Sequence, residues 1–256
     1  MTANKLFSFF LLLLILASCS TEDNPENNGL NKSANLKNLG TSATDLLSSE
    51  RFTSMRVEMV YVTSYEPSQK TIDNLKEFLR ERTNKPDGIS VVTRAVSSSD
   101  KAPFKIEEIV EIEAAERLQY NAGDEIAVYV YFADGTNEGD TDTKIILGSA
   151  YRNTSIVIYG KTIESVASRY NAPDKSTIES TVLNHEFGHL FGLVNLGSPL
   201  QSEHEDGENK GHCEVSGCLM NANVQFGSDL INMVNTNAVP GLDDQCILDL
   251  QVSGGK

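Results

Sequence analysis

The stretch NHEFGHLFGLVN, residues 184–195, constrains this chain more than any other part of it. It places His185 and His189 four residues apart, so on a helix their imidazole rings share one face and can converge on one metal ion. Glu186 follows the first histidine, where its carboxylate can hydrogen-bond a water on that metal. Zn²⁺ suits such a site, because catalytic zinc takes three protein ligands and a water. The stretch supplies only two of these ligands.

The sequence around the motif predicts an amphipathic helix that begins near Ser176. Glu179 lies three residues after this serine, as in a capping box. The apolar stripe that would face the core consists of Leu183, Phe187, Leu190 and Val194. Gly192 can end the helix, because glycine adopts a positive φ without strain. Two exposed histidines could show the same spacing by chance, but the helical context favours a metal site.

The extended pattern His-Glu-x-x-His-x-x-Gly over residues 185–192 resembles the metzincin clan of zinc peptidases, in which a third ligand follows three residues after the glycine. Here that position is Asn195, a poor zinc ligand, and the other histidines of the chain are His204 and His212. His212 opens the stretch HCEVSGCLMN. This resembles the archaemetzincin signature, a zinc-binding histidine followed by cysteine and then Cys-x-Met. The resemblance implies His212 as the third ligand, after an insertion over residues 195–211.

The role of His204 stays open. Its acidic neighbours in SEHEDGE favour an exposed position for His204 on a loop. As alternatives, His204 could bind a second ion or be the third zinc ligand itself. A comparison of bound zinc in His204→Ala and His212→Ala would decide between the two histidines.

The resemblance to archaemetzincins also implies roles for residues after His212. Met220 would form the Met-turn, an apolar floor under the metal. Cysteines in that family hold a second, structural zinc, and the corresponding set here would be Cys213, Cys218, Asp243 and Cys246. A disulfide between two of the three cysteines is the alternative, because disulfides persist in exported proteins. The odd number of cysteines mildly favours the metal, and both arrangements stay open.

The first residues predict export and lipid anchoring. An apolar run over residues 6–17 is shorter than the roughly 20 residues that span a bilayer and is typical of a secretory signal. It ends in LASC, which resembles the bacterial lipobox, so residues 1–18 are predicted to be removed and Cys19 to be lipidated. An ordinary signal peptide with an incidental cysteine is the alternative. Residues 19–50, rich in Asn, Ser, Thr and Gly, are predicted to be a flexible tether.

Residues 51–256 are predicted to form one domain. Strand-like segments lie at 55–65, 88–96, 125–135, 146–151 and 154–160, and helical spacing occurs at 67–85 and 102–123. With the resemblance, this predicts an α+β, metzincin-like fold with a mixed twisted sheet, an active-site helix and a small C-terminal subdomain. The strand-like stretch at 146–151 and 154–160 precedes that helix, where metzincins place an antiparallel edge strand. The resemblance therefore implies that this stretch binds peptide by strand addition. A plain core strand is the alternative.

These features predict a zinc endopeptidase in which Glu186 acts as general base on a water activated by the metal. The layout resembles the membrane metalloproteases of Bacteroidetes-type bacteria. This resemblance implies a lipoprotein of the bacterial cell envelope, at the outer membrane, that acts on peptides or proteins. The net charge of -15 argues against nucleic acid as a partner, because phosphate contacts need clustered Lys and Arg. The alternative function is a metal-binding surface lipoprotein without proteolytic activity, in which Glu186 would have no role.

Overall fold

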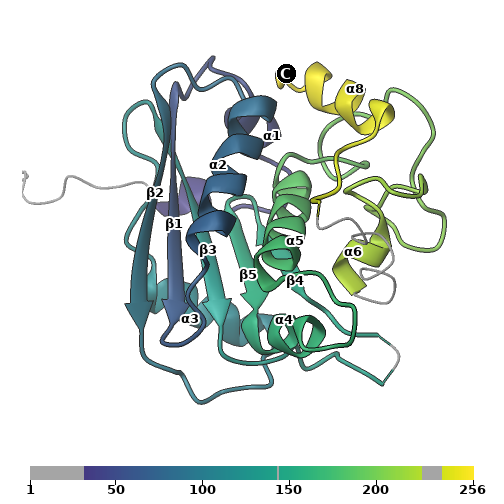
Figure 1. Cartoon of the computed structure of the whole chain (residues 1–256). Coiled ribbons are helices and arrows are strands. Elements are labelled where there is room, and N and C mark those ends of the chain that lie inside the picture. Colours follow the sequence, from purple (N-terminus) through teal and green to yellow (C-terminus); the bar gives the residue numbers. More distant parts are fainter. Residues whose placement is uncertain (1–31, 143, 227–237) are drawn as a thin grey trace, which may run out of the picture.

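One mixed sheet of five strands organises the computed structural model, which describes residues 32–142, 144–226 and 238–256 (Figure 1). The strands are β1 (Ser54–Val62), β2 (Gly88–Val96), β3 (Glu125–Ala133), β4 (Gly148–Arg152) and β5 (Ser155–Tyr159). Their order across the sheet is β2-β1-β3-β5-β4. All neighbouring strands are parallel except β4 and β5, which are antiparallel. The segment expected to form an antiparallel edge strand is therefore β4.

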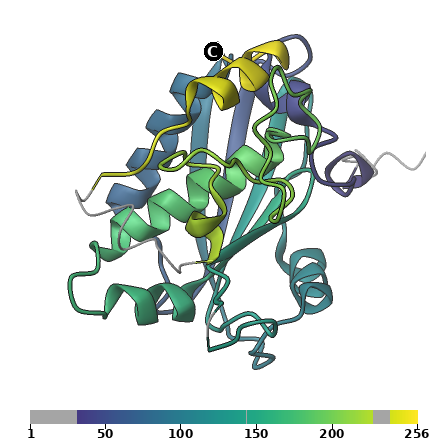
Figure 2. The same ribbon diagram turned by 90° about the vertical axis from the view of Figure 1, so that its right-hand side faces the viewer.

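Helices cover both faces of this sheet, and for that reason its central strands are almost continuously apolar. α3 (Ile106–Glu116) packs on one face, and α2 (Gln69–Arg82), α4 (Gly160–Ala167) and α5 (Lys175–Leu190) pack on the other (Figure 2). Successive residues of β3 alternate between the two cores, as the pleat of a strand requires. Val128 and Val130 belong to the core beneath α2 and α5, and Tyr129 and Tyr131 belong to the core beneath α3.

The helix that carries the histidine motif is buried on every side. Leu183, Phe187 and Leu190 lie in the core as predicted, but the rest of the helix from Thr177 to Leu190 is buried as well. Val194 is also in the core, although it lies beyond the helix with a φ of 53°. The helix also begins one residue before Ser176. Asp174 is its N-cap and accepts a hydrogen bond from the amide of Thr177 at 2.8 Å. Glu179, predicted to complete a capping box, instead accepts a hydrogen bond from Thr71 of α2 at 2.7 Å.

The predicted tether is wrong for residues 32–50. This segment forms a 3₁₀ helix (Lys32–Asn35) and α1 (Ala43–Leu47), and the side chains of Leu46 and Leu47 are fully buried in the core. Asn35 is also buried and donates to the carbonyl of Ala127 in β3 at 2.9 Å. The polar composition of this segment predicted a tether, although the segment contributes two leucines to the core and an asparagine that hydrogen-bonds a strand carbonyl. The predicted signal peptide, Cys19 and the rest of the tether lie outside the described residues.

The chain after α5 forms the predicted C-terminal part, described over residues 191–226 and 238–256. It consists of loops with two short helices, α6 (Ala222–Phe226) and α8 (Asp244–Val252), and it lies along α5 on the side away from the sheet (Figure 1). The predicted α+β fold with a mixed sheet and a helix that carries the histidine motif is confirmed. No helix among the described residues is long and apolar enough to cross a membrane.

The packing of residues 32–50 predicts how the domain responds to mutation. Leu47→Ala should lower the free energy of unfolding by about 2–5 kcal/mol, because it leaves a cavity in the core. Leu36→Ala is the matched control, since Leu36 is 43% exposed, and it should change stability by less than about 0.5 kcal/mol. Urea denaturation of both variants measures the difference. Equal stabilities would mean that residues 32–50 do not belong to the folded domain.

Candidate metal centre

Three histidine rings meet between α5 and the C-terminal part. His185 and His189 come from the motif helix, and His212 comes from the loop that follows the insertion. One ring nitrogen of each lies within 4.8 Å of the other two, and all three side chains are buried. The distances between ring centroids are 4.7 Å for His185–His189, 5.3 Å for His185–His212 and 5.0 Å for His189–His212. The structure therefore brings together the three residues predicted to bind the catalytic zinc.

The orientation of the His185 ring is fixed from behind. Its Nδ1 lies 2.7 Å from the carbonyl oxygen of Leu219, to which the N–H on that nitrogen donates. The other nitrogen, Nε2, is buried and has no hydrogen-bond partner among the described residues. A histidine that donates one N–H to a backbone carbonyl offers the lone pair of its other nitrogen, which is the usual arrangement of a metal-binding imidazole. The unsatisfied Nε2 therefore fits a metal ligand.

The electrostatic surroundings keep the two helical histidines neutral. Burial, and then the neighbouring ring of His212, lower the pKa of His185 to about 3. Burial also holds the pKa of His189 well below its usual value. Neutral imidazole is the form that binds transition metals, so at neutral pH the donors need not lose a proton first. Three imidazole nitrogens within reach of one point fit Zn²⁺ in chemistry and number.

Glu186 directly follows His185 in α5, and its side chain is held by the edge strand. Its Oε2 accepts a hydrogen bond from the backbone N–H of Ala150 in β4 at 2.7 Å, and its Oε1 is buried without a partner among the described residues. Burial raises the pKa of this carboxyl to about 8, against the opposing effect of the Ala150 hydrogen bond. Gly148 makes room for it, because a Cβ at that position would lie 3.1 Å from the same Oε1. The hydrogen bond from Ala150 thus fixes Oε2, and Oε1 is left to accept or donate a proton.

Two glycines of the motif serve the packing of this site. A Cβ on Gly188 would lie 2.2 Å from the Sδ of the buried Met220, so only glycine lets that methionine pack against α5. Gly192 has a φ of 71°, and a Cβ there would lie 2.6 Å from the amide nitrogen of Ser198. The predicted exit of the chain from the helix at Gly192 with positive φ is confirmed. Asn195, at the position of a usual third ligand, is exposed and its amide faces Glu205.

His204 is neither exposed nor part of the histidine cluster. Its side chain is fully buried, and its Nε2 lies 2.9 Å from Asp249 of α8. Its Nδ1 lies 3.4 Å from the sulfur of Cys213, within a second group that also contains Asp243 and Cys246. The expectation of an exposed loop residue is wrong, because the partners inside the fold offset the cost of burying the ring.

The three cysteines among the described residues form no disulfide. Cys213, Cys218 and Cys246 are all buried with free thiols, so the structure gives no support to the predicted disulfide alternative. Asp243 is the N-cap of α8 and accepts a hydrogen bond from the amide of Cys246 at 2.8 Å. Sequence analysis missed Asp249, as well as Gly148, Ala150 and Leu219 around the histidines. A glycine within a predicted strand, as at position 148, is the one signal that pointed to a close backbone approach.

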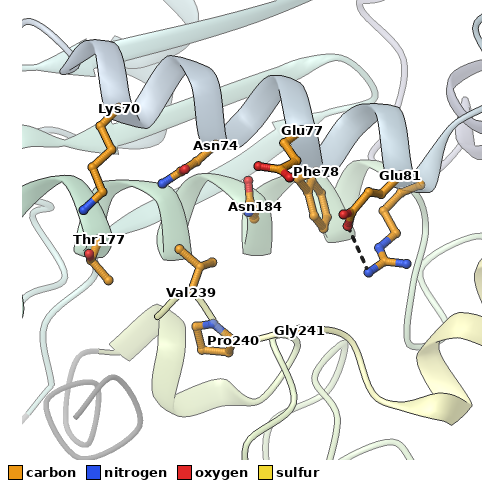
Figure 3. Close-up of a pocket in the computed structure, with 11 residues that line it drawn as sticks. Lys70, Asn74, Glu77, Phe78, Glu81, Thr177, Asn184, Val239, Pro240 and Gly241 are labelled. Carbon is orange, nitrogen blue, oxygen red and sulfur yellow. Dashed lines mark ion pairs between the residues drawn. The ribbon is translucent and has the colours of Figure 1, made fainter. Parts of the chain in front are cut away.

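A separate pocket of about 350 Å³ opens between α2, α5 and residues 239–241 (Figure 3). Its lining includes Lys70, Asn74, Glu77, Thr177 and Asn184, and Glu81 pairs with its neighbour Arg82 at 3.5 Å. The lining contains none of the residues that form the histidine cluster. Its charged side chains have both signs and all come from α2. The histidine cluster is therefore the candidate functional site.

No protein-family model matches the sequence, and a search of curated proteins found no match. Among solved structures, archaemetzincin from Methanopyrus kandleri superimposes with a TM-score of 0.51 at 18% identity, over 79% of this chain and 97% of that one. The fold is similar to that of archaemetzincin. Metalloproteinase-II from Bacteroides fragilis matches with a TM-score of 0.41 at 14% identity, over 89% of this chain and 58% of that one. The likeness to archaemetzincin confirms the fold predicted from the motif.

The burial of Glu186 predicts a pH dependence for the metal-free protein. Its pKa is raised on folding from 4.5 to about 8, so this group favours the folded state fully below pH 4.5 and ceases to do so as pH rises through about 8. Glutamine does not ionise, so Glu186→Gln does not lose stability over this pH interval. Its free energy of unfolding relative to the parent should therefore rise over that interval, by a few kcal/mol in order of magnitude.

The measurement is chemical denaturation of both chains at several pH values with a chelator present. Glu164→Gln, at a half-exposed position on α4, is the control for replacing a carboxylate by an amide. A stability difference between Glu186→Gln and the parent that stays constant with pH would show that Glu186 is not held in a desolvated site.

Proposed function

We propose that this protein is a zinc-dependent endopeptidase, anchored to the bacterial cell envelope through a lipid on Cys19. The observation that carries the proposal is the buried Oε1 of Glu186, which has no partner among the described residues and belongs to the residue that directly follows His185 of the three-histidine cluster. A structural metal site needs no such carboxylate. A hydrolytic site needs a base close to the metal.

In this proposal His185, His189 and His212 hold the zinc. The metal, when bound, lowers the pKa of water and polarises the carbonyl of the scissile peptide. Glu186 accepts the proton of the attacking water on Oε1 and returns it to the leaving amine, while Ala150 holds Oε2 in place. A carboxyl whose pKa is raised by burial suits both transfers, because it can release the proton that it has taken. No serine or cysteine nucleophile is needed.

The edge strand β4 supports peptide binding next to this carboxylate. Among the described strands, β4 pairs only with β5 and is therefore an edge strand, along which we propose that an extended peptide binds. Such a peptide would add to the sheet through backbone hydrogen bonds, and this mode places the main chain without demanding a particular side chain. The hydrogen bond from Ala150 to Glu186 joins the strand to the base. We therefore assign peptides or proteins as the substrate class.

Other parts of the proposal rest on the resemblance and on the sequence. Met220 is proposed as the Met-turn residue, supported by its burial against Gly188 of α5. The apolar run at residues 6–17 and the LASC sequence support a lipoprotein at the outer membrane. The net charge of -15 supports a site that does not act on nucleic acid.

Replacing Glu186 tests this function. Glu186→Gln should retain zinc, because the three imidazoles are intact, and should lower the rate of peptide cleavage by roughly 10²–10⁴-fold, as expected for loss of a general base. Glu164→Gln is the control and should cleave at the parent rate. A library of unstructured peptides, followed by mass spectrometry with and without chelator, measures cleavage, and elemental analysis measures zinc.

The possible results distinguish the proposed peptidase from a metal-binding protein without proteolytic activity. Cleavage that a chelator abolishes and zinc restores, and that Glu186→Gln lacks, is the expected result. A folded parent chain that binds zinc and cleaves no peptide would contradict the proposal and favour a metal-binding surface lipoprotein. Undiminished cleavage by Glu186→Gln would show that another residue is the base.

A further inference from the structure

The insertion over residues 195–211 ends directly before His212, which is the member of the histidine cluster that does not lie on α5. His185 and His189 are fixed by a buried helix. A ligand on a loop keeps backbone and side-chain freedom that a helical ligand has already lost, and it must lose this freedom when it binds a metal. Contacts that restrict His212 lie within the insertion itself.

Two carbonyl groups of the insertion hold the ring of His212. Its Nδ1 lies 3.3 Å from the carbonyl oxygen of Asn209 and 3.2 Å from that of Lys210. A carbonyl oxygen only accepts hydrogen bonds, so in the neutral ring the proton lies on Nδ1 and the lone pair on Nε2. A backbone carbonyl behind a metal-binding imidazole sets its tautomer and ring orientation in this way. The two carbonyls therefore do for His212 what the carbonyl of Leu219 does for His185.

Asp206 closes the turn that places these carbonyls. Its Oδ1 accepts hydrogen bonds from the backbone amides of Glu208 at 2.8 Å and Asn209 at 3.2 Å. Its Oδ2 accepts one from the side-chain amide of Asn209 at 2.9 Å. An aspartate that binds backbone amides two and three residues further along forms an Asx-turn, which fixes backbone that belongs to no helix or strand. The side chain of Asp206 thus holds the residue whose carbonyl faces the His212 ring.

The backbone joins both ends of this turn to His212. The amide of Asp206 donates to the carbonyl of His212 at 2.7 Å, and the amide of His212 donates to the carbonyl of Asn209 at 3.1 Å. Next to them, Glu205 and Cys213 pair as an isolated antiparallel bridge. A change in the turn at residues 206–209 therefore acts on backbone that is hydrogen-bonded to His212.

We propose that Asp206 is a positioning residue for His212, because it holds the turn whose carbonyls fix the tautomer and the orientation of the third imidazole. The proposal rests on the proposed function only in taking His212 as a zinc ligand, and it requires no peptidase activity. A longer loop costs more entropy to hold in one place. The Asx-turn restricts the loop before a metal binds, so less freedom is lost on binding.

Zinc affinity of the full chain tests the proposal. Asp206→Ala should weaken zinc binding at the histidine cluster about tenfold, because groups that orient a metal ligand typically contribute about 10–100-fold to affinity. Asp206→Asn should bind zinc like the parent, since the side-chain oxygen of asparagine can accept the same two backbone amides. Glu208→Ala is the matched control. It removes the same charge from the same turn, to which the exposed Glu208 contributes its backbone amide.

Competition with a chelator measures this affinity. Zinc that the parent binds and His185→Ala/His189→Ala lacks is assigned to the histidine cluster, so zinc bound elsewhere does not enter the comparison. Urea denaturation of each metal-free variant shows whether it is folded. If Asp206→Ala does not fold, Asp206→Ser takes its place, because serine closes such a turn more weakly than aspartate, and it should weaken zinc binding to a smaller extent.

The tautomer of His212 gives a readout that a general loss of stability would not change. In the metal-free parent labelled with ¹⁵N-histidine, nuclear magnetic resonance should place the proton of this ring on Nδ1, and the same holds for Asp206→Asn and Glu208→Ala. Asp206→Ala should show a larger share of the form with the proton on Nε2, because the ring is no longer held against the two carbonyls. The signals of His212 are those that His212→Ala lacks.

Three results would overturn the proposal. One is a proton on Nε2 of His212 in the metal-free parent, a measurement that needs no variant at position 206. Another is a folded Asp206→Ala chain that keeps both the tautomer and the zinc affinity of the parent. The third is equal weakening of zinc binding by Asp206→Ala and Glu208→Ala, which would assign the effect to charge alone. A parent chain that binds zinc and cleaves no peptide contradicts the proposed function instead, so the two failures are distinguishable.

Discussion

Burial of the motif helix is the constraint on which the rest of this structure depends. α5 lies between the sheet and the C-terminal part, so two imidazoles and a carboxylate that solvent would normally hydrate are placed in the interior. Burial of this kind costs free energy unless each polar atom finds a partner. Leu219 and Ala150 satisfy one atom each of His185 and Glu186, and the atoms that remain are those that a metal and a water would satisfy. The same burial makes the imidazoles neutral and raises the pKa of the carboxyl, which suits ligands and a general base.

The sequence predicted the parts of this arrangement that depend on local spacing. The motif helix, the exit at Gly192 and the strands at 88–96 and 125–135 follow from period and composition, and the structure contains them. Elements whose ends are set by tertiary contacts were predicted less well. The helix expected over 102–123 is Ile106–Glu116, and the start of α5 depends on Asp174. The packing of residues 32–50 was missed because two buried leucines are a weak signal within a polar segment.

The two clusters of histidine, cysteine and aspartate side chains show the same limit of sequence reasoning. His212 was assigned through its neighbour Cys213, a local feature, and the structure places it with the helical pair. His204 was misjudged because two of its three partners, Asp249 and Cys246, lie more than forty residues away in the sequence. The adjacency of His212 and Cys213 links the two groups, so the order of the C-terminal part and the geometry of the histidine cluster depend on each other.

Anomalous scattering at the zinc edge from crystals of the zinc-loaded protein tests the central claim most directly. The account predicts a peak at bonding distance from ring nitrogens of His185, His189 and His212, with Glu186 near the metal but not bound to it. A zinc-loaded crystal with no peak at these three rings, or with a peak that Glu186 coordinates in place of His212, would contradict it.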